Sequence, residues 1–251
     1  MKKLTTKNLK YIFYLDILGF KNLINERSPD EIYSIIEKLL EAHYSWEEHN
    51  DLFSTIYFSD TVIFYQTREE YMKTAFLDIY GIAGIIFSKL LAENIPVRGV
   101  ITLGEFYTKY DIKGRNNMFF GNALIEAHEL EKNELVGITI SYSAFKNIDN
   151  IILEAFIKEN VFERQGENLL LNPFHQIRSL YSCESIYDAD RDMLLAELKA
   201  IKYLLDKKME YSLKDPESKE YKKYSNTVNF LERNMKDGKF ELVKKMIATL
   251  I

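Results

Sequence analysis

Two short stretches of the chain place a single aspartate beside sequence that is typical of a buried β-strand. Tyr11 to Phe20 (YIFYLDILGF) has Asp16 at the end of its apolar run, and Ser54 to Tyr65 (STIYFSDTVIFY) has Asp60 between two such runs. Apolar runs about five residues long, rich in β-branched and aromatic side chains, predict central strands of a sheet that is covered on at least one face. An aspartate in that position requires a chemical reason.

Helical periodicity predicts the elements around these strands. The sequence SPDE, from Ser28 to Glu31, has the form of a capping box that opens a helix. The later elements are expected as a helix over Arg68 to Glu93, a strand from Pro96, a helix over Asn122 to Lys132, and strands over Val136 to Ser141 and Leu169 to Phe174. The order strand, helix, strand, strand, helix, strand predicts an α+β fold with a ferredoxin-like βαββαβ core, which many unrelated activities share.

The last quarter of the chain has a different pattern. From about Asp188 the composition shifts towards Lys, Glu, Leu and Tyr at helical spacing. Three helices are expected there, over Ala189 to Met209, Pro216 to Met235 and Lys239 to Ile251. We therefore predict two parts, an α+β domain over residues 1–185 and a helical C-terminal extension over residues 186–251 that packs on the first part or dimerises.

The overall composition limits the classes of protein and partner. With 251 residues and 47% hydrophobic side chains, the chain is long and apolar enough to bury a sizeable core. A net charge of −5 argues against duplex nucleic acid as a partner, although a small phosphorylated ligand needs only a local basic site. The single cysteine, Cys183, excludes an intrachain disulfide framework, and the longest apolar stretch, Ile79 to Ala92, is too short to span a membrane. These features predict a cytoplasmic protein without a membrane or nucleic-acid partner.

The two aspartates suggest metal chemistry if their strands lie side by side. Both carboxylates then reach one end of the sheet, where two unit charges about 4 Å apart repel by about 4 kcal/mol at an effective dielectric constant near 20. A hard divalent cation with a preference for oxygen ligands, such as Mg²⁺ or Mn²⁺, removes that cost. The alternative is that Asp16 caps the following helix and that Asp60 occupies a hairpin turn, both of which are common roles for aspartate.

Four segments, in order, carry a resemblance to a known family over roughly residues 10 to 140. YLDILGF resembles the opening strand and turn of class III nucleotide cyclase catalytic domains, and FSDTVIFY resembles their second aspartate in a strand, turn and strand. Pro96 to Gly104 (PVRGVITLG) resembles their Arg-x-Gly strand, and Phe120 to Glu131 (FGNALIEAHELE) resembles their Gly-led helix. The resemblance implies a class III cyclase core of ferredoxin-like topology over residues 1–185.

The resemblance also implies an activity and a set of site residues. A class III cyclase joins the ribose 3′-oxygen of a nucleoside triphosphate to the α-phosphate and releases pyrophosphate. By resemblance, Asp16 and Asp60 bind two Mg²⁺ or Mn²⁺ ions, the carbonyl group of Ile17 assists them, and Arg98 contacts the triphosphate. Arginine suits that role because its planar fork is always charged and binds phosphate oxygens in a bidentate way. The alternative for Arg98 is an ordinary salt bridge.

A homodimer is also implied, because family cyclases assemble each active site from both chains. The residues that the resemblance assigns to substrate binding besides Arg98 are Phe20, Tyr57, Asn117 and Asn122. Tyr57, Asn117 or Asn122 from the partner subunit could read the base, and each could equally be structural.

Three positions depart from the pattern of purine cyclases. The helix after the Gly carries Ile125 and Glu129 where those enzymes carry an Asn and an Arg, and the second strand carries Ile56 where they carry a base-reading Lys. One explanation is an inactive cyclase fold that is retained for nucleotide binding or protein interaction. The other is a different base. A purine cyclase remains a further alternative.

The helix after Gly121 favours the different base, because GNALIEAHELE is similar to the helix of the divergent bacterial pyrimidine cyclases of the Pycsar antiphage system. That resemblance implies synthesis of cyclic UMP or cyclic CMP as a second messenger in antiviral defence, with a separate protein as the effector that senses it. Both metal-binding carboxylates and the phosphate-binding arginine are retained, which supports an active enzyme. A polymerase-like palm shares the two-aspartate chemistry, but the chain lacks a Gly-Gly-Asp-Asp or Gly-Gly-Asp-Glu-Phe turn and a basic surface.

Overall fold

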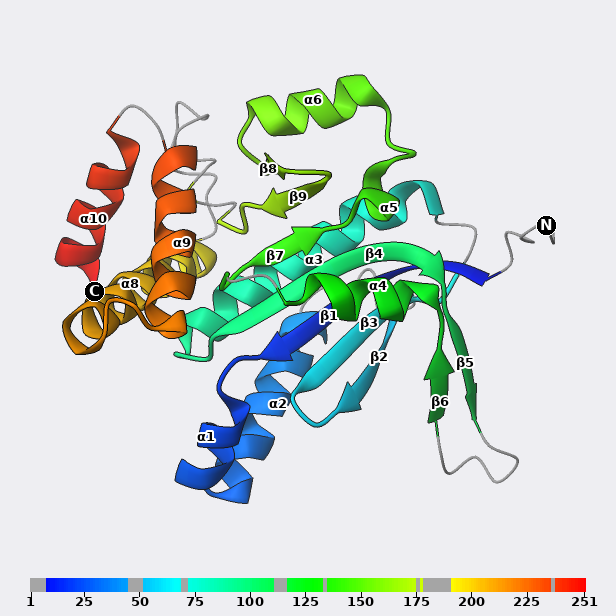
Figure 1. Cartoon of the computed structure of the whole chain (residues 1–251), viewed down its shortest axis with the longest axis horizontal. Coiled ribbons are helices and arrows are strands. Elements are labelled where there is room, and N and C mark those ends of the chain that lie inside the picture. Colours follow the sequence, from blue (N-terminus) through cyan, green and yellow to red (C-terminus); the bar gives the residue numbers. More distant parts are fainter. Residues whose placement is uncertain are drawn as a thin grey trace.

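The computed structural model describes residues 8–44, 52–68, 72–110, 117–132, 135–174, 177, 191–235 and 238–251. The predicted boundary between residues 185 and 186, and Cys183, lie outside the described residues. Figure 1 shows a central sheet with helices on both faces and a helical C-terminal part to one side.

Among the described residues, seven strands form one mixed sheet in the order β2-β3-β1-β4-β7-β9-β8. Its members are β1 (Leu9–Ile17), β2 (Phe53–Phe58), β3 (Thr61–Gln66), β4 (Val97–Glu105), β7 (Ile138–Ile140), β8 (Phe162–Gln165) and β9 (Asn168–Leu171). β1 pairs antiparallel with both β3 and β4, and β2 pairs antiparallel with β3. With the helices that connect them, these four strands have the split βαββαβ arrangement, so the predicted α+β fold with a ferredoxin-like core is confirmed.

Three helices of the described part connect the core strands. They are α1 (Phe20–Glu26), α2 (Pro29–Tyr44) and α3 (Met72–Ala92). The predicted capping box begins α2, because the Ser28 N–H donates to Glu31 Oε2 at 2.8 Å and the Glu31 N–H donates to Ser28 Oγ at 3.4 Å. The segment Thr74–Ala92 of α3 is long and apolar enough to cross a membrane by length and composition, and 61% of its most apolar window is buried inside the protein. A core helix passes the same test, and α3 packs on β1 and β4.

Side-chain alternation along β1 divides the core between the two faces of the sheet. Phe13, Leu15 and Ile17 pack into the larger core with α3, whereas Ile12 and Tyr14 pack into a smaller core with α4 (Asn122–Leu130). Figure 1 shows α4 in front of the sheet and α3 behind it. Asp16 is in phase with Ile12 and Tyr14, so its side chain belongs to the α4 face.

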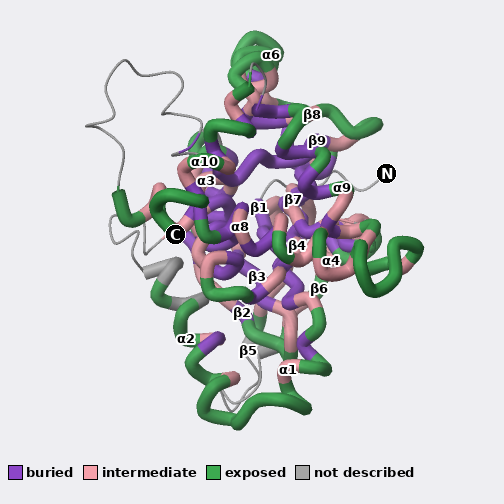
Figure 2. The backbone as a smooth tube through the Cα atoms, turned by 90° about the vertical axis from the view of Figure 1, so that its left-hand side faces the viewer, coloured by how far each residue is buried: buried purple, intermediate pink, exposed green. Residues whose placement is uncertain are grey.

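A second, two-stranded sheet formed by β5 (Tyr107–Tyr110) and β6 (Asn117–Phe120) projects from the far end of β4, as Figure 1 shows. The rings of Tyr107 and Phe120 stack with their centroids 5.1 Å apart. After β7 come the short helix α5 (Tyr142–Phe145) and α6 (Asn150–Lys158). Figure 2 shows α6 as a largely exposed element above a buried centre.

The C-terminal part consists of α8 (Arg191–Lys214), α9 (Lys219–Asn234) and α10 (Lys239–Leu250). Three helices were predicted here, although α8 continues beyond the predicted end at Met209. α8 packs on α3. The Val136 N–H donates to Thr227 Oγ1 of α9 at 3.0 Å, and the buried Glu197 carboxylate of α8 accepts from the Ile177 N–H at 2.7 Å. α8 and α9 therefore pack on the α+β part, while a division into two domains stays a prediction.

Candidate active site

Strand register brings the first predicted aspartate and the predicted arginine together. On the antiparallel pair β1 and β4, Asp16 lies directly opposite Arg98, and on the other side of β1 it lies opposite Thr61 of β3. Arg98 is in phase with Val100, which packs in the same small core as Tyr14. Both polar side chains therefore lie on the α4 face, at the end of the sheet where β1 finishes and β4 begins.

The second predicted aspartate reaches the same end of the sheet by a tight turn. Ser59 and Asp60 connect β2 to β3, and Ser59 adopts a left-handed backbone conformation with φ 57°. The backbone carbonyl of Asp60 accepts a hydrogen bond of 3.0 Å from the Ile17 N–H. The hairpin-turn location considered from the sequence is thus correct for Asp60, and it places this residue beside the end of β1 rather than away from it.

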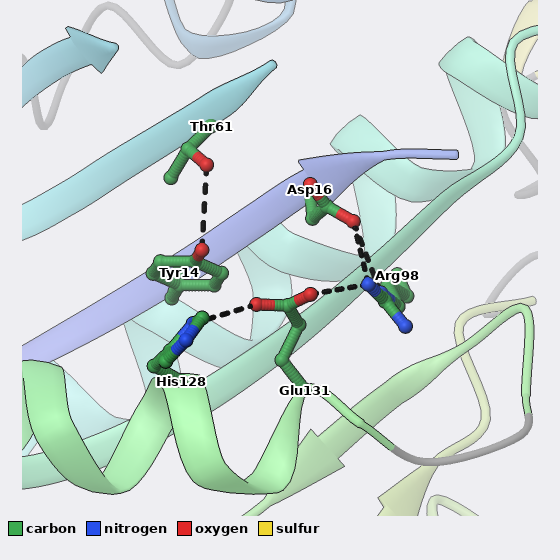
Figure 3. A network of polar contacts seen from close by, with 6 residues as sticks. All are labelled: Tyr14, Asp16, Thr61, Arg98, His128 and Glu131. Carbon is green, nitrogen blue, oxygen red and sulfur yellow. Dashed lines mark hydrogen bonds and ion pairs between the residues drawn. The ribbon is translucent and has the colours of Figure 1, made fainter. Parts of the chain in front are cut away.

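Arg98 lies between two carboxylates, as Figure 3 shows. Its Nε donates to Asp16 Oδ2 at 3.0 Å, and its Nη2 lies 2.9 Å from the same oxygen. Nη2 also donates to Glu131 Oε1. The salt bridge that the sequence left as an alternative for Arg98 is therefore present, but it is partly buried and joins β1, β4 and the end of α4.

Glu131 is a site residue that sequence reasoning did not single out. It follows the last residue of α4, is 8% exposed, and accepts a second contact from His128 Nδ1 at 3.2 Å. A signal for it was present in the sequence: Ala123, Ala127 and Glu131 are spaced by four, so they share one face of the helix. Because both alanines are fully buried against the sheet, that face carries the glutamate inward as well.

The electrostatic environment of Asp16 disfavours its charged form. Burial raises the pKa of Asp16 to about 6, the Arg98 guanidinium opposes that rise, and the negative charges of Glu131 and Asp60 add to it. Nearby, burial raises the pKa of Tyr14 to about 12, and its hydroxyl lies 3.3 Å from Thr61 Oγ1. The cluster of three acids and one arginine therefore carries excess negative charge, which a bound cation would neutralise.

The two aspartates fit a divalent ion of a particular kind. Among the described residues, no group of three or more His, Cys, Asp or Glu side chains could hold a metal by itself. Mg²⁺, however, is usually bound by one or two carboxylates together with substrate phosphates, not by an all-protein cage. Asp16 and Asp60 supply that number of hard oxygen donors, and the negative charge of Asp60 lies close enough to Asp16 to add to the rise in its pKa that burial causes.

The other residues that were predicted to bind the substrate lie on different elements and differ in burial. Phe20 is 8% exposed and belongs to the main core, so packing accounts for its side chain without a ligand. Tyr57 is exposed on β2, three residues before Asp60. Asn122 is exposed at the first turn of α4, and Asn117 lies opposite Tyr110 in the β5-β6 pair, with its side chain outside the described part.

Neither Asn117 nor Asn122 meets Asp16 within one chain. α4 begins beside Gly104, where a Cβ would lie 3.1 Å from the Ala123 nitrogen, and it ends beside Arg98. Those two residues of β4 are separated by six steps along the strand, a distance of about 20 Å at the usual rise per residue. The predicted base-reading role of both asparagines therefore requires a second chain.

The three positions that depart from the purine pattern differ in their exposure to solvent. Ile56 is buried in the small core, and Glu129 is exposed. Ile125 is 59% exposed on α4 and leaves an apolar side chain on the helix surface. None of these side chains offers the hydrogen-bonding groups of Lys, Asn or Arg.

No family model matches the chain, and no curated protein matches it. The chain is similar in structure to solved nucleotide cyclase domains. The catalytic core of a rhodopsin-guanylyl cyclase with converted specificity, in complex with ATPalphaS, is 15% identical with a TM-score of 0.46, over 57% of this chain and 83% of that chain. The monomeric guanylyl cyclase domain of RhoGC from Blastocladiella emersonii is 13% identical with a TM-score of 0.49, over 65% and 93%.

The adenylyl cyclase CyaB from P. aeruginosa is 17% identical with a TM-score of 0.43, over 56% of this chain and 82% of that chain. The fold assignment rests on the strand order and register described above. The likeness to these structures shows neither an activity nor a substrate, because the TM-scores lie below 0.5.

Proposed function

We propose that the protein is a nucleotide cyclase that converts a nucleoside triphosphate into a 3′,5′-cyclic nucleotide and pyrophosphate. The observation that carries this proposal is the meeting of Asp16, Asp60 and Arg98 at one end of the sheet, from three segments that each resemble a cyclase motif. A purely structural ion pair gives no reason for a third acid, Asp60, whose charge adds to the cost of ionising Asp16.

The chemistry requires the ribose 3′-hydroxyl to lose its proton and attack the α-phosphorus while the bond from that phosphorus to the bridging oxygen of pyrophosphate breaks. Asp16 and Asp60 would hold Mg²⁺ or Mn²⁺, and such ions supply Lewis acidity at the attacking and leaving oxygens. Arg98 would bind phosphate oxygens, because its guanidinium lies beside Asp16 and its planar fork matches phosphate oxygens in a bidentate way. The backbone carbonyl of Ile17 lies next in the chain after Asp16 and would assist the ions.

The substrate that we propose is UTP or CTP, because the purine-reading side chains are absent. Ile56 is buried and cannot hydrogen-bond a base, and Ile125 and Glu129 offer no donor equivalent to Asn and Arg. Tyr57 is exposed on β2, but it lies opposite Val62 of the main core, so its side chain belongs to the face of the sheet away from Asp16. A contact between Tyr57 and the base would therefore serve the site of a partner subunit. By resemblance to Pycsar cyclases, the cyclic pyrimidine nucleotide would act in antiphage defence on a separate effector protein.

A homodimer is part of this proposal. Asn122 stands at the end of β4 that is about 20 Å from Arg98, and Asn117 lies opposite Tyr110 in the β5-β6 pair that continues from that end, so both would serve the site of a partner subunit rather than their own. Exposed apolar side chains occur in the same region, at Met118 and Phe120 of β6 and at Ile125 of α4. Apolar residues that cluster on an exposed face are typical of a surface that a partner covers.

A nucleotide-binding protein without turnover is the second candidate, and one observation favours it. Arg98 is engaged by both Asp16 and Glu131, so in this arrangement two of its three nitrogens are already occupied by the protein. If that arrangement persisted with nucleotide bound, the arginine would contribute less to the phosphates. Such a protein would bind triphosphates without converting them.

The deciding experiment is incubation of the purified protein with ATP, GTP, CTP and UTP separately in Mn²⁺, with the products identified by chromatography and mass. Asp60→Ala is the test variant, and Asp206→Ala, which removes an exposed aspartate of α8, is the matched control. A cyclic pyrimidine nucleotide that is made by the wild type and the control but not by Asp60→Ala supports the full proposal. A cyclic purine nucleotide would retain the cyclase and contradict the base assignment, whereas no product from any triphosphate would favour the binding protein.

A further inference from the structure

Glu131 is the acid in the cluster that the proposed chemistry leaves without a role. Its carboxylate is nearly fully buried at the end of α4, and it contacts Arg98 through one oxygen and His128 through the other. A buried carboxylate without a cationic partner costs several kcal/mol, so this residue needs Arg98. Arg98, in contrast, already has a carboxylate partner in Asp16, so the reason for a second one lies elsewhere.

The contacts of Arg98 show how its orientation is fixed. On the β1 side, Asp16 contacts Nε and Nη2 of Arg98, and on the α4 side, Glu131 contacts Nη2. Nη1 has no hydrogen-bond partner among the described residues. In Figure 3 this part of the guanidinium points away from both carboxylates. Two anchors on different elements therefore hold the planar group still and leave one nitrogen with its protons available to an outside acceptor.

The two anchors differ in what the proposed function requires of them. Asp16 is to bind a divalent cation, and a cation and a guanidinium compete for the same carboxylate oxygens. If Asp16 were the sole anchor, Arg98 would either block the cation or lose its orientation when the cation arrived. With Glu131 present, Asp16 is able to exchange Arg98 for the cation while the guanidinium stays in place.

We propose that Glu131 is the positioning residue for Arg98: it holds the guanidinium beside Asp16, frees Asp16 for the divalent cation and aims Nη1 at the triphosphate. This inference rests on the proposed nucleotide site and deepens it. Glu131 itself does not touch the substrate in this scheme. Its effect passes through Arg98, so the two residues should behave as one unit when both are changed.

The test compares Glu131→Gln with wild type in two measurements. Asp16 still offers Arg98 a carboxylate in this variant, so it is expected to fold. In the first measurement, the thermal unfolding midpoint is followed as a function of Mn²⁺ concentration without nucleotide. We expect the Mn²⁺ concentration that gives half of the maximal shift in the unfolding midpoint to rise about tenfold, because Arg98 now competes with Mn²⁺ for Asp16. In the second, kcat/KM for the preferred triphosphate is expected to fall at least about tenfold, chiefly through KM.

A matched control and a double-mutant cycle separate positioning from mere stability. Glu154→Gln removes an exposed acid that also pairs with an arginine, Arg164 at 2.6 Å, and both measurements should stay at wild-type values. In the background of Arg98→Lys, which keeps the charge but lacks the planar fork, Glu131→Gln should cause little further loss. Additive losses would overturn the proposal. The proposal would also be overturned if Glu131→Gln had a lower unfolding midpoint but the same Mn²⁺ dependence and the same kinetics as the wild type.

The outcomes also separate this inference from the proposed function. If the wild type converts no triphosphate, the cyclase proposal fails, and the Mn²⁺ dependence of the unfolding midpoint still decides the role of Glu131. If Glu131→Gln does not fold, Glu131→Asp takes its place, because the shorter side chain keeps the charge but cannot hold the guanidinium in the same position. A wild type whose midpoint does not respond to Mn²⁺ at all would overturn both proposals.

Discussion

Arg98 at the end of the sheet and Glu210 on the surface of α8 each contact two side chains of opposite charge. Glu210 lies 2.8 Å from Lys207 and 2.5 Å from Lys214, and Arg98 lies 2.9 Å from Asp16 and also pairs with Glu131. The surroundings differ far more than the distances do. The Glu210 side chain is 37% exposed, whereas those of Asp16 and Glu131 are 12% and 9% exposed.

That difference decides what each group of ion pairs does for the protein. Water screens the surface group, which is worth little to stability and is free to break and form. The buried group has lost its hydration, so removing one member leaves an uncompensated charge, while keeping all members is itself no gain over apolar packing. A buried group of this kind at a strand end is better explained by chemistry than by stability.

The largest effect is expected from Asp16→Asn, which keeps the size of the side chain and one hydrogen-bond acceptor for Arg98 but removes the negative charge. Turnover of the preferred triphosphate should fall at least about a thousandfold, because cation stabilisation of the reacting oxygens is worth several kcal/mol. The free energy of unfolding without Mn²⁺ should not fall, since the variant removes the desolvation cost of the buried carboxylate, which is the largest cause of its raised pKa, together with the repulsion from Glu131 and Asp60. Product formation and chemical unfolding are measured on the same preparation, and a variant that stays active would contradict the metal-binding role.

Arg98→Met is expected to have the largest effect on stability. It leaves Asp16 and Glu131 buried without their shared cation, and the free energy of unfolding should drop by about 3 to 5 kcal/mol near neutral pH. Lys214→Met, which removes one partner of Glu210, is the matched control and should cost less than about 1 kcal/mol. Urea unfolding followed by circular dichroism gives both values. Equal losses would mean that burial does not separate the two groups.

The pH dependence of stability should report the raised pKa of Asp16. Burial raises that pKa to about 6 in the native state, so the native protein binds the proton more tightly than the unfolded chain does. The free energy of unfolding of wild type, minus that of Asp16→Asn, should therefore rise by about 2 kcal/mol as the pH falls from about 7.5 to about 4.5. Saturating Mn²⁺ should flatten this difference, because the cation favours the carboxylate. A flat profile without Mn²⁺ would show that Asp16 is not electrostatically strained.

The sequence predicted most of the arrangement that makes these tests possible. The apolar runs around Asp16 and Asp60 predicted the strands, and the order of elements predicted the ferredoxin-like core that the strand pairing confirms. The location of Asp16 and Asp60 at one end of the sheet followed from that topology, because strands that pair side by side bring their ends together. Local pattern was sufficient here, since each step depended on neighbouring residues or on strand order.

Other features depended on contacts between distant segments, which periodicity alone does not give. The Arg98–Glu131 pair joins β4 to the end of α4, and a sequence motif places neither side chain relative to the other. Phe20 was assigned to substrate binding by resemblance, yet its neighbours in three dimensions form the main core. The base-reading roles of Asn117 and Asn122 stay predictions, because one chain places Asn122 and the β5-β6 pair away from Asp16 and the pairing of two chains is not encoded in any local pattern.

The smallest effect is expected from Glu210→Gln. Hydrogen bonds from Lys207 and Lys214 lower the pKa of Glu210 to about 2, which by itself suggests a strong interaction. The carboxylate is exposed, however, so water and salt screen both lysines, and holding two long side chains in one geometry costs entropy. The free energy of unfolding should change by less than about 1 kcal/mol at low salt, and the change should vanish at about 1 M salt, where the Debye length is about 3 Å. Arg98→Met should keep most of its effect under the same conditions, because salt does not reach a buried pair. If salt abolished both effects equally, the Arg98 group would be as well hydrated as the surface group, and the argument that its burial signals chemistry would fail.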